Sequence, residues 1–180
     1  MNREELRKAL TRLGELLRER RVTGEIAVFG GAAIVLGFDW REGTEDVDAL
    51  ITKGHGEVVR AQQEVGEELG LPSDWLNEQA TSYLAKQQDF ELYRTYPSEG
   101  QFGLRVWLAK PQYVLAMKIL AARRYKDVQD IIPLARHLNL TTAADLRNLV
   151  KHYYPEEEIS PERLVFLRDL VGKINAAPQP

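Results

Sequence analysis

The first twenty residues place apolar side chains at helical spacing among charged ones. Five leucines recur at intervals of one to four residues between arginine, lysine and glutamate: Leu6, Leu10, Leu13, Leu16 and Leu17. This pattern predicts an amphipathic helix over residues 3–20, ending near Val22 or Gly24. Such a helix would open the fold as a packing element.

Two strands and several helices are predicted in the next fifty residues. Residues 26–29 are apolar on both faces, which is typical of a strand inside a sheet, and residues 47–51 are the second strand candidate. Helices are expected at residues 32–36, at residues 57–69 with the stop signals Gly70 and Pro72, and from Ser73 or Asp74 through Trp75.

The second half changes from strands to helices. Residues 90–93 and 104–108 are strand candidates on either side of the turn-rich residues 97–100. Four helices are then expected at residues 111–124, 126–138, 142–153 and 161–175. The pattern predicts an α+β fold: a mixed sheet flanked by helices over residues 1–110, then a helical subdomain over residues 111–180. A cleft between two such halves is a usual ligand site.

Composition restricts the class of protein further. The chain of 180 residues has no cysteine and a formal charge of -3, so a disulfide scaffold and a general nucleic-acid-coating surface are disfavoured. It has no signal segment and no apolar run of membrane-spanning length, so we expect a soluble cytoplasmic protein without a membrane partner.

One arrangement carries recognisable chemistry. Gly30 and Gly31 end the first apolar strand, and Asp46 and Asp48 alternate at the start of the second. Alternate side chains of a strand share a face, so the two carboxylates would project together while Val47 faces the core. Two close carboxylates suit Mg²⁺ or Mn²⁺, and a glycine turn before a helix suits phosphates. The alternative is a simple turn beside an incidental pair of acids.

These residues resemble the nucleotidyltransferase superfamily related to DNA polymerase beta. Within it, the chain is most similar to minimal nucleotidyltransferases of the abortive-infection, AbiEii-like toxin–antitoxin group. The similarity covers about residues 26–132 and rests on motifs in the same order: Gly30-Gly31, Thr44, Asp46, Asp48, Trp75-Leu76-Asn77, Lys118, Arg123 and Lys126-Asp127.

The resemblance implies transfer of a nucleoside monophosphate from a nucleoside triphosphate to a hydroxyl of a tRNA end or a partner protein. It implies catalytic roles for Asp46, Asp48 and Lys118, with the two aspartates as metal ligands. It also implies a nucleotide-binding set: Gly30, Gly31, Thr44, Arg123, Lys126 and Asp127.

A third carboxylate is the feature that separates two hypotheses. In the superfamily it lies on a later strand, but residues 104–108 contain no acid, and Asp89 and Glu91 are the nearby substitutes. The first hypothesis is a metal-dependent transferase. The second is a non-catalytic nucleotide-binding or antitoxin-like module that binds a partner protein.

Charged and aromatic residues elsewhere leave alternatives open. Lys118 lies on a predicted helix that is apolar nearly all round, so its ammonium group must reach a carboxylate, a phosphate or solvent. We favour a phosphate or the carboxylates of Asp46 and Asp48. Asp127 and Asp130 are spaced for pairs with Arg123 and Lys126, and a solvated face is expected for Asp130 more than for Lys126 or Asp127. Trp40 and Trp75 suit either a base stack or the core. The three histidines lack metal-ligand spacing.

Overall fold

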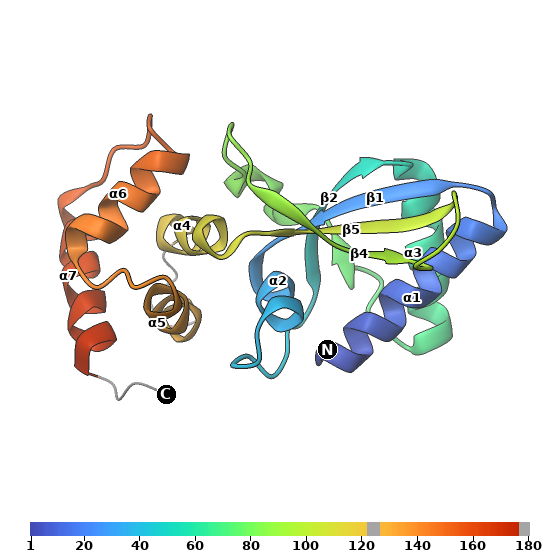
Figure 1. The fold of residues 1–180 in the computed structure, drawn as a ribbon, viewed down its shortest axis with the longest axis horizontal. Helices are drawn as coiled ribbons and strands as arrows, with labels where there is room; N and C mark the ends of the chain where they lie inside the picture. Colours follow the sequence, from blue (N-terminus) through green and yellow to red (C-terminus); the bar gives the residue numbers. More distant parts are fainter. Residues whose placement is uncertain (122–126, 177–180) are drawn as a thin grey trace. The chain divides into compact units, whose positions relative to one another are not determined.

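The computed structural model describes residues 1–121 and 127–176 and divides into two compact units. The sheet unit comprises Met1–Ser82 and Phe90–Ala109, and the helical unit comprises Tyr83–Asp89 and Lys110–Pro180. The described part of the chain has one five-stranded mixed sheet and seven α-helices, so the predicted α+β class is confirmed (Figure 1).

The sheet places the first predicted strand at its centre. Its order is β3-β2-β1-β5-β4, with β1 antiparallel to β2 and parallel to β5, β3 parallel to β2, and β4 antiparallel to β5. The strands are β1 (Thr23–Val28), β2 (Val47–Lys53), β3 (Leu76–Asn77), β4 (Phe90–Tyr96) and β5 (Gly103–Ala109). Burial on both faces of β1 explains its run of apolar residues.

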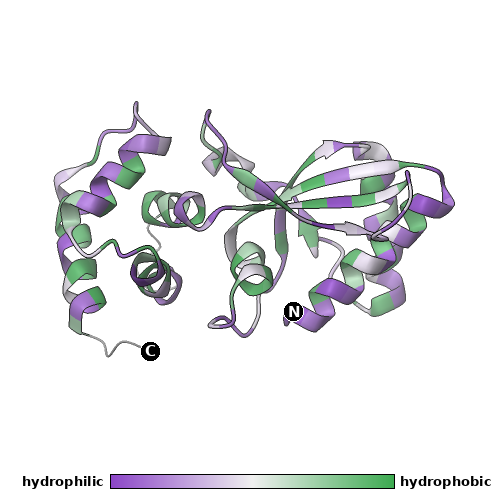
Figure 2. Cartoon of the chain, in the orientation of Figure 1, coloured by the Kyte–Doolittle hydropathy of each residue, from purple (hydrophilic) through white to green (hydrophobic). Residues whose placement is uncertain are grey.

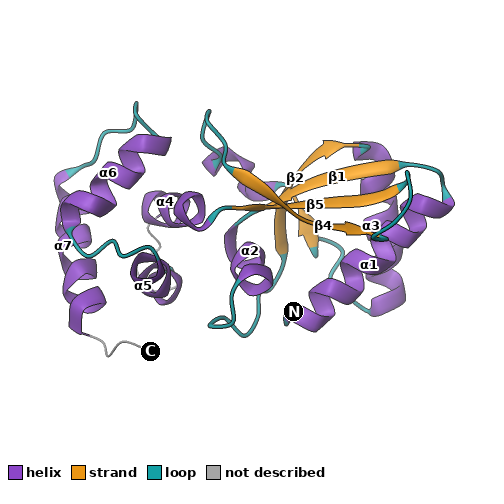
Figure 3. Cartoon of the chain, in the orientation of Figure 1, coloured by secondary structure: helices purple, strands orange, loops and turns teal. Residues whose placement is uncertain are grey.

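Three helices pack on one face of this sheet. They are α1 (Arg3–Glu19), α2 (Gly30–Gly37) and α3 (His55–Leu69) (Figure 3). A Cβ atom on Gly24 of β1 would meet Val58 of α3 and Leu17 of α1, and one on Gly37 of α2 would contact Leu108 of β5. Gly24 pairs with Leu104 of β5, and Leu108 lies four residues after Leu104 on the same strand. Gly24 and Leu108 therefore point to the same side of the sheet. The opposite face carries no α-helix of this unit.

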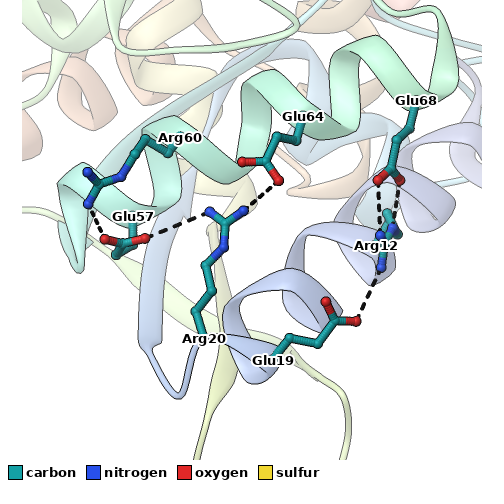
Figure 4. Close-up of polar contacts among 7 residues, drawn as sticks. All are labelled: Arg12, Glu19, Arg20, Glu57, Arg60, Glu64 and Glu68. Carbon is teal, nitrogen blue, oxygen red and sulfur yellow. Dashed lines mark hydrogen bonds and ion pairs between the residues drawn. The ribbon is translucent and has the colours of Figure 1, made fainter.

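Charged side chains connect α1 to α3 along their exposed sides (Figure 4). Arg12 donates to both carboxylate oxygens of Glu68, and Arg20 pairs with Glu57 and Glu64. The hydrogen bond from Arg12 lowers the pKa of Glu68 below its ordinary value. These exposed pairs orient the two helices, whereas the burial of α1's leucines supplies most of the attraction.

The helical unit contains the four C-terminal helices. They are α4 (Pro111–Ala121), α5 (Val128–His137), α6 (Ala143–Tyr153) and α7 (Pro161–Ala176). Figure 2 shows α4 as mainly apolar, in keeping with six buried residues among its eleven. Tyr113 of α4 accepts a hydrogen bond from the backbone N–H of Ala85, which ties the segment before β4 to this unit.

One predicted element is wrong. Residues 73–75 form turns and bends instead of a helix, and the chain continues as β3 and then a 3-10 helix over Gln79–Tyr83. The N–H of Val47 donates to the carbonyl of Trp75, so pairing with the edge of the sheet extends the backbone there. In the described part of the chain, no helix has both the length and the apolar character needed to cross a bilayer.

Candidate functional site

The glycine pair makes a sharp turn from β1 into α2. Gly30 has φ +63°, a left-handed conformation that glycine adopts without strain, and it is the first residue of the helix. The residue before it, Phe29, gives no side-chain cap to the first turn. The first N–H groups of α2 therefore receive no side-chain acceptor from the N-cap residue. The turn in front of these N–H groups is a suitable position for an anion.

Asp48 lies directly beside that turn. Its Oδ2 atom is 3.0 Å from the position that a Cβ atom on Gly30 would occupy, and its carbonyl accepts from the N–H of Phe29 at 3.0 Å. Val47 and Ala49 are fully buried while Asp46 and Asp48 are only partly so, which is the predicted alternation. Ile51, which the same alternation would place in the core, is only half-buried.

Asn77 holds the first of the two acids. It is the register partner of Asp48 on β3, and its Nδ2 atom donates to Asp46 Oδ2 at 3.2 Å and to the Asp74 carbonyl at 3.2 Å. The amide therefore fixes Asp46 from the neighbouring strand. This contact gives the asparagine of the Trp75-Leu76-Asn77 segment a positioning role.

Arg41 is a further residue of the site that sequence reasoning missed. Its Nη2 atom is 3.0 Å from the position of a Cβ on Gly31, and Thr44 Oγ1 is 2.8 Å from the same position. Arg41 Nε also donates to the Gly43 carbonyl at 2.9 Å. The guanidinium, the hydroxyl and the glycine turn form one cluster. An arginine in a polar loop gives no distinctive sequence signal, because only the folded loop brings it back to Gly31.

The loop that carries Arg41 and Thr44 is attached to α1 at several points. Arg3 Nε donates to the Val35 carbonyl at 2.7 Å, and the same guanidinium contacts the Phe38 carbonyl and Asp39. The N–H of Thr44 donates to the carbonyl of Met1 at 2.9 Å. These contacts hold the loop in place against the helix and the glycine turn.

In the helical unit, Lys118 forms a buried ion-pair cluster. Its Nζ atom lies 2.9 Å from Asp127 Oδ1 and 2.8 Å from Asp130 Oδ2, and the three side chains are 13%, 10% and 3% exposed. Lys118 thus pairs with one carboxylate on α5 and one directly before it. The expectation of a solvated face for Asp130 is wrong, because its carboxylate is buried in an ion pair with Lys118. Arg123 and Lys126 lie outside the described residues.

The two substitutes for a third carboxylate lie in different units of the chain. Glu91 is exposed on β4, which is separated from β2 by β1 and β5, a span of about 14 Å. Asp89 accepts from Lys110 and from the Tyr153 hydroxyl, and the Lys110 hydrogen bond lowers its pKa. Over residues 1–121 and 127–176, no group of three histidine or acidic side chains is placed to hold a metal ion.

The two tryptophans considered for base stacking differ. Trp75 is fully buried, and its indole N–H donates to the Gln62 carbonyl at 2.8 Å, so it belongs to the core. Trp40 is 38% exposed and stacks on Phe38 at 4.1 Å between ring centroids.

A mixed sheet with helices on one face, a glycine turn into a helix and an acidic strand beside it define a nucleotidyltransferase-like protein. The chain belongs to the family described as "Nucleotidyltransferase of unknown function (DUF6036)", whose model matches residues 4–165. Comparison with curated proteins and with solved structures finds no match to this chain.

Proposed function

We propose that the protein is a metal-dependent nucleotidyltransferase that moves a nucleoside monophosphate from a nucleoside triphosphate to a hydroxyl acceptor. The observation that carries the proposal is the cluster around Gly30 and Gly31, with Asp48 on one side and Arg41 with Thr44 on the other. It combines carboxylates for a divalent cation with cationic and N–H donors for phosphates, which is the chemistry that nucleotidyl transfer needs.

The residues fit a bound Mg²⁺ or Mn²⁺. Asp48 Oδ2 lies 3.0 Å from the position of a Cβ on Gly30, and Asn77 orients Asp46 two residues earlier on the chain, so these two carboxylates are the proposed oxygen donors for the cation. A bound divalent cation would supply charge neutralisation for the phosphates. Arg41, Thr44 and the first N–H groups of α2 would bind the leaving β- and γ-phosphates and hold the triphosphate in position.

Membership of the AbiEii-like toxin–antitoxin group extends this proposal. It is supported by the order of motifs and by the pairing of Lys118 with Asp127, which brings two of its motif residues into contact within the helical unit. In that group's pattern Lys118, Arg123, Lys126 and Asp127 would serve the nucleotide. Lys118→Ala should then lower triphosphate affinity by on the order of 1–3 kcal/mol.

A non-catalytic nucleotide-binding or antitoxin-like module is the second candidate. The absence of an acid on β5, and of a three-ligand group among the described residues, favours it. Such a module would bind the triphosphate at the same glycine turn and act through a partner protein.

The test uses each of the four triphosphates labelled on the α-phosphate, with Mg²⁺ or Mn²⁺ and either total tRNA or cell lysate. The proposal expects the label to appear on one class of macromolecule. Triphosphate binding without any labelled product would support the non-catalytic module, and absence of both binding and product would contradict either function.

A further inference from the structure

The strand that carries Asn77 is short for an element that must hold a side chain in place. β3 has two residues, Leu76 and Asn77, which pair with Val47 and Asp48 of β2. It lies at the edge of the sheet, so it has a neighbouring strand on one side only. Strands in globular proteins are usually about three to ten residues long. Contacts beyond its own ladder must therefore help to fix β3, and with it the amide that orients Asp46.

Glu78, the residue directly after β3, makes such contacts. Its Oε1 atom accepts from the backbone N–H of Ile51 at 2.9 Å, so the side chain extends the pairing with β2 beyond the end of β3. Its Oε2 atom lies 2.8 Å from Nε2 of His55, the first residue of α3. One carboxylate thus ties the end of β3 to both β2 and α3.

The two contacts of Glu78 differ in weight. The side chains of His55 and Glu78 are 61% and 32% exposed, and an exposed ion pair contributes little free energy. The hydrogen bond from Ile51 is partly buried and satisfies a backbone N–H that has no strand beside it there. His55 therefore mainly orients the carboxylate, and the bond to Ile51 supplies most of the attachment.

The Asn77 amide has one favourable orientation. Its Oδ1 atom accepts from the N–H of Gln79 at 3.0 Å, while Nδ2 donates to Asp46 and to the Asp74 carbonyl. Turning the amide over would place its oxygen against a carboxylate and a carbonyl, neither of which can donate. The position of β3 therefore decides how closely Nδ2 approaches Asp46.

We propose that Glu78, in its pair with His55, is a positioning residue for the candidate cation site: it holds β3 against β2 and so keeps the Asn77 amide on the Asp46 carboxylate. The inference rests on the proposed function, because it names what holds a ligand of that same site. Groups that hydrogen-bond a metal-ligating carboxylate fix its direction and strengthen metal binding.

The first test follows the backbone and needs no metal. The N–H of Val47 donates to the Trp75 carbonyl at 2.7 Å, next to the paired residues of β3, and the N–H of Ile51 donates to Glu78. Hydrogen exchange of both amides should be at least about fivefold faster in Glu78→Ala, the factor for one lost hydrogen bond. Glu78→Gln keeps a side-chain oxygen for Ile51 and should exchange as the wild type does.

The second test measures binding of Mn²⁺ alone by calorimetry, without triphosphate. We expect a Kd about 10- to 100-fold weaker in Asn77→Ala, the range for losing the partner of a metal ligand, and about 10-fold weaker in Glu78→Ala. The double variant should bind no more weakly than Asn77→Ala, because Glu78 acts through Asn77. A general loss of stability would instead add to the effect of Asn77→Ala.

Glu57→Ala is the matched control. Glu57 lies two residues after His55 on α3, its side chain is 30% exposed, and it pairs with Arg20 and Arg60. It should keep wild-type Mn²⁺ affinity and wild-type exchange at Val47. His55→Ala should give a fraction of the Glu78→Ala effect, and it measures the same contact if Glu78→Ala fails to fold.

The outcomes separate this inference from the proposed function. Unchanged exchange at Val47 in Glu78→Ala would show that β3 is held without this carboxylate and would overturn the inference. Unchanged Mn²⁺ affinity in Glu78→Ala, or additive losses in the double variant with Asn77→Ala, would also overturn it. Wild-type protein that binds no Mn²⁺ would contradict the proposed cation site as well, whereas failure confined to the Glu78 variants contradicts the inference alone.

Discussion

The guanidinium of Arg41 lies over Gly31, with its Nη2 atom 3.0 Å from the position that a Cβ atom on that glycine would take. Gly31 has no positive φ, whereas its neighbour Gly30 does. The two glycines therefore serve different purposes: Gly30 allows the turn, and Gly31 allows Arg41 and Thr44 to approach it.

Gly31→Ala should weaken triphosphate binding about tenfold while leaving the melting temperature nearly unchanged. The added methyl group would displace the Arg41 guanidinium, which is the end of a flexible side chain, and would force the Thr44 hydroxyl to rotate away, while Gly31 has no positive φ that alanine would strain. Calorimetry with Mg²⁺ and thermal melting measure the two effects. Gly37→Ala is the control on the same helix, since its Cβ would make only an ordinary contact at 4.0 Å. Equal affinities in the two variants would contradict a phosphate role for this turn.

Arg41→Met should lower triphosphate affinity by about 10- to 100-fold, the scale of a lost hydrogen bond to a charged group. Arg41→Lys should recover part of the loss, because it keeps the charge but not the planar donor geometry. Affinity for the corresponding monophosphate should change much less in both variants. A loss that is the same for monophosphate and triphosphate would place Arg41 away from the leaving phosphates.

Lys118→Met should destabilise the helical unit by about 3–5 kcal/mol, because it leaves Asp127 and Asp130 buried together without their cation. Denaturant unfolding measures the loss, and Lys173→Met, at an exposed position of α7, is the control. Adding Asp130→Asn to Lys118→Met should restore part of the stability. A Lys118→Met protein as stable as its control would show that the cluster does not hold α4 and α5 together.

The stability contributed by Asp89 should depend on pH. Hydrogen bonds from Lys110 and Tyr153 hold its pKa below the unfolded value, so the folded state favours the carboxylate. This contribution is present above the unfolded pKa and is lost as the pH falls through the folded pKa. The difference in unfolding free energy between wild type and Asp89→Asn should therefore be constant at neutral pH and shrink below about pH 4. A difference that does not change with pH would contradict this role.

Local patterns were enough to predict most elements, because their physical causes are local. The leucine spacing of α1, the doubly apolar β1 and the Gly70 stop of α3 each act within one element, and Gly70 has the left-handed conformation expected of a helix end. The strand β3 was missed because two residues are ordered by pairing with β2 rather than by their own propensity.

The site was only partly predictable for the same reason. The alternation of Asp46 and Asp48 is a property of one strand, so it could be read from the sequence. Arg41 approaches Gly31 only because of the path of the loop after α2. Asp130 meets Lys118 only because α4 and α5 pack together. No spacing rule anticipates them.

The most direct test of the account compares wild-type protein with Asp48→Asn in the transfer reaction, using triphosphate labelled on either the α- or the γ-phosphate. The account predicts that wild-type protein places the α-label, and not the γ-label, on the acceptor. Asp48→Asn should lose this activity by about two to three orders of magnitude while melting at a similar temperature, because several kcal/mol of charge stabilisation depend on the carboxylate. Glu91→Gln, which removes an exposed carboxylate distant from β2, should remain active. Equal α-label transfer by Asp48→Asn and wild type would contradict the account.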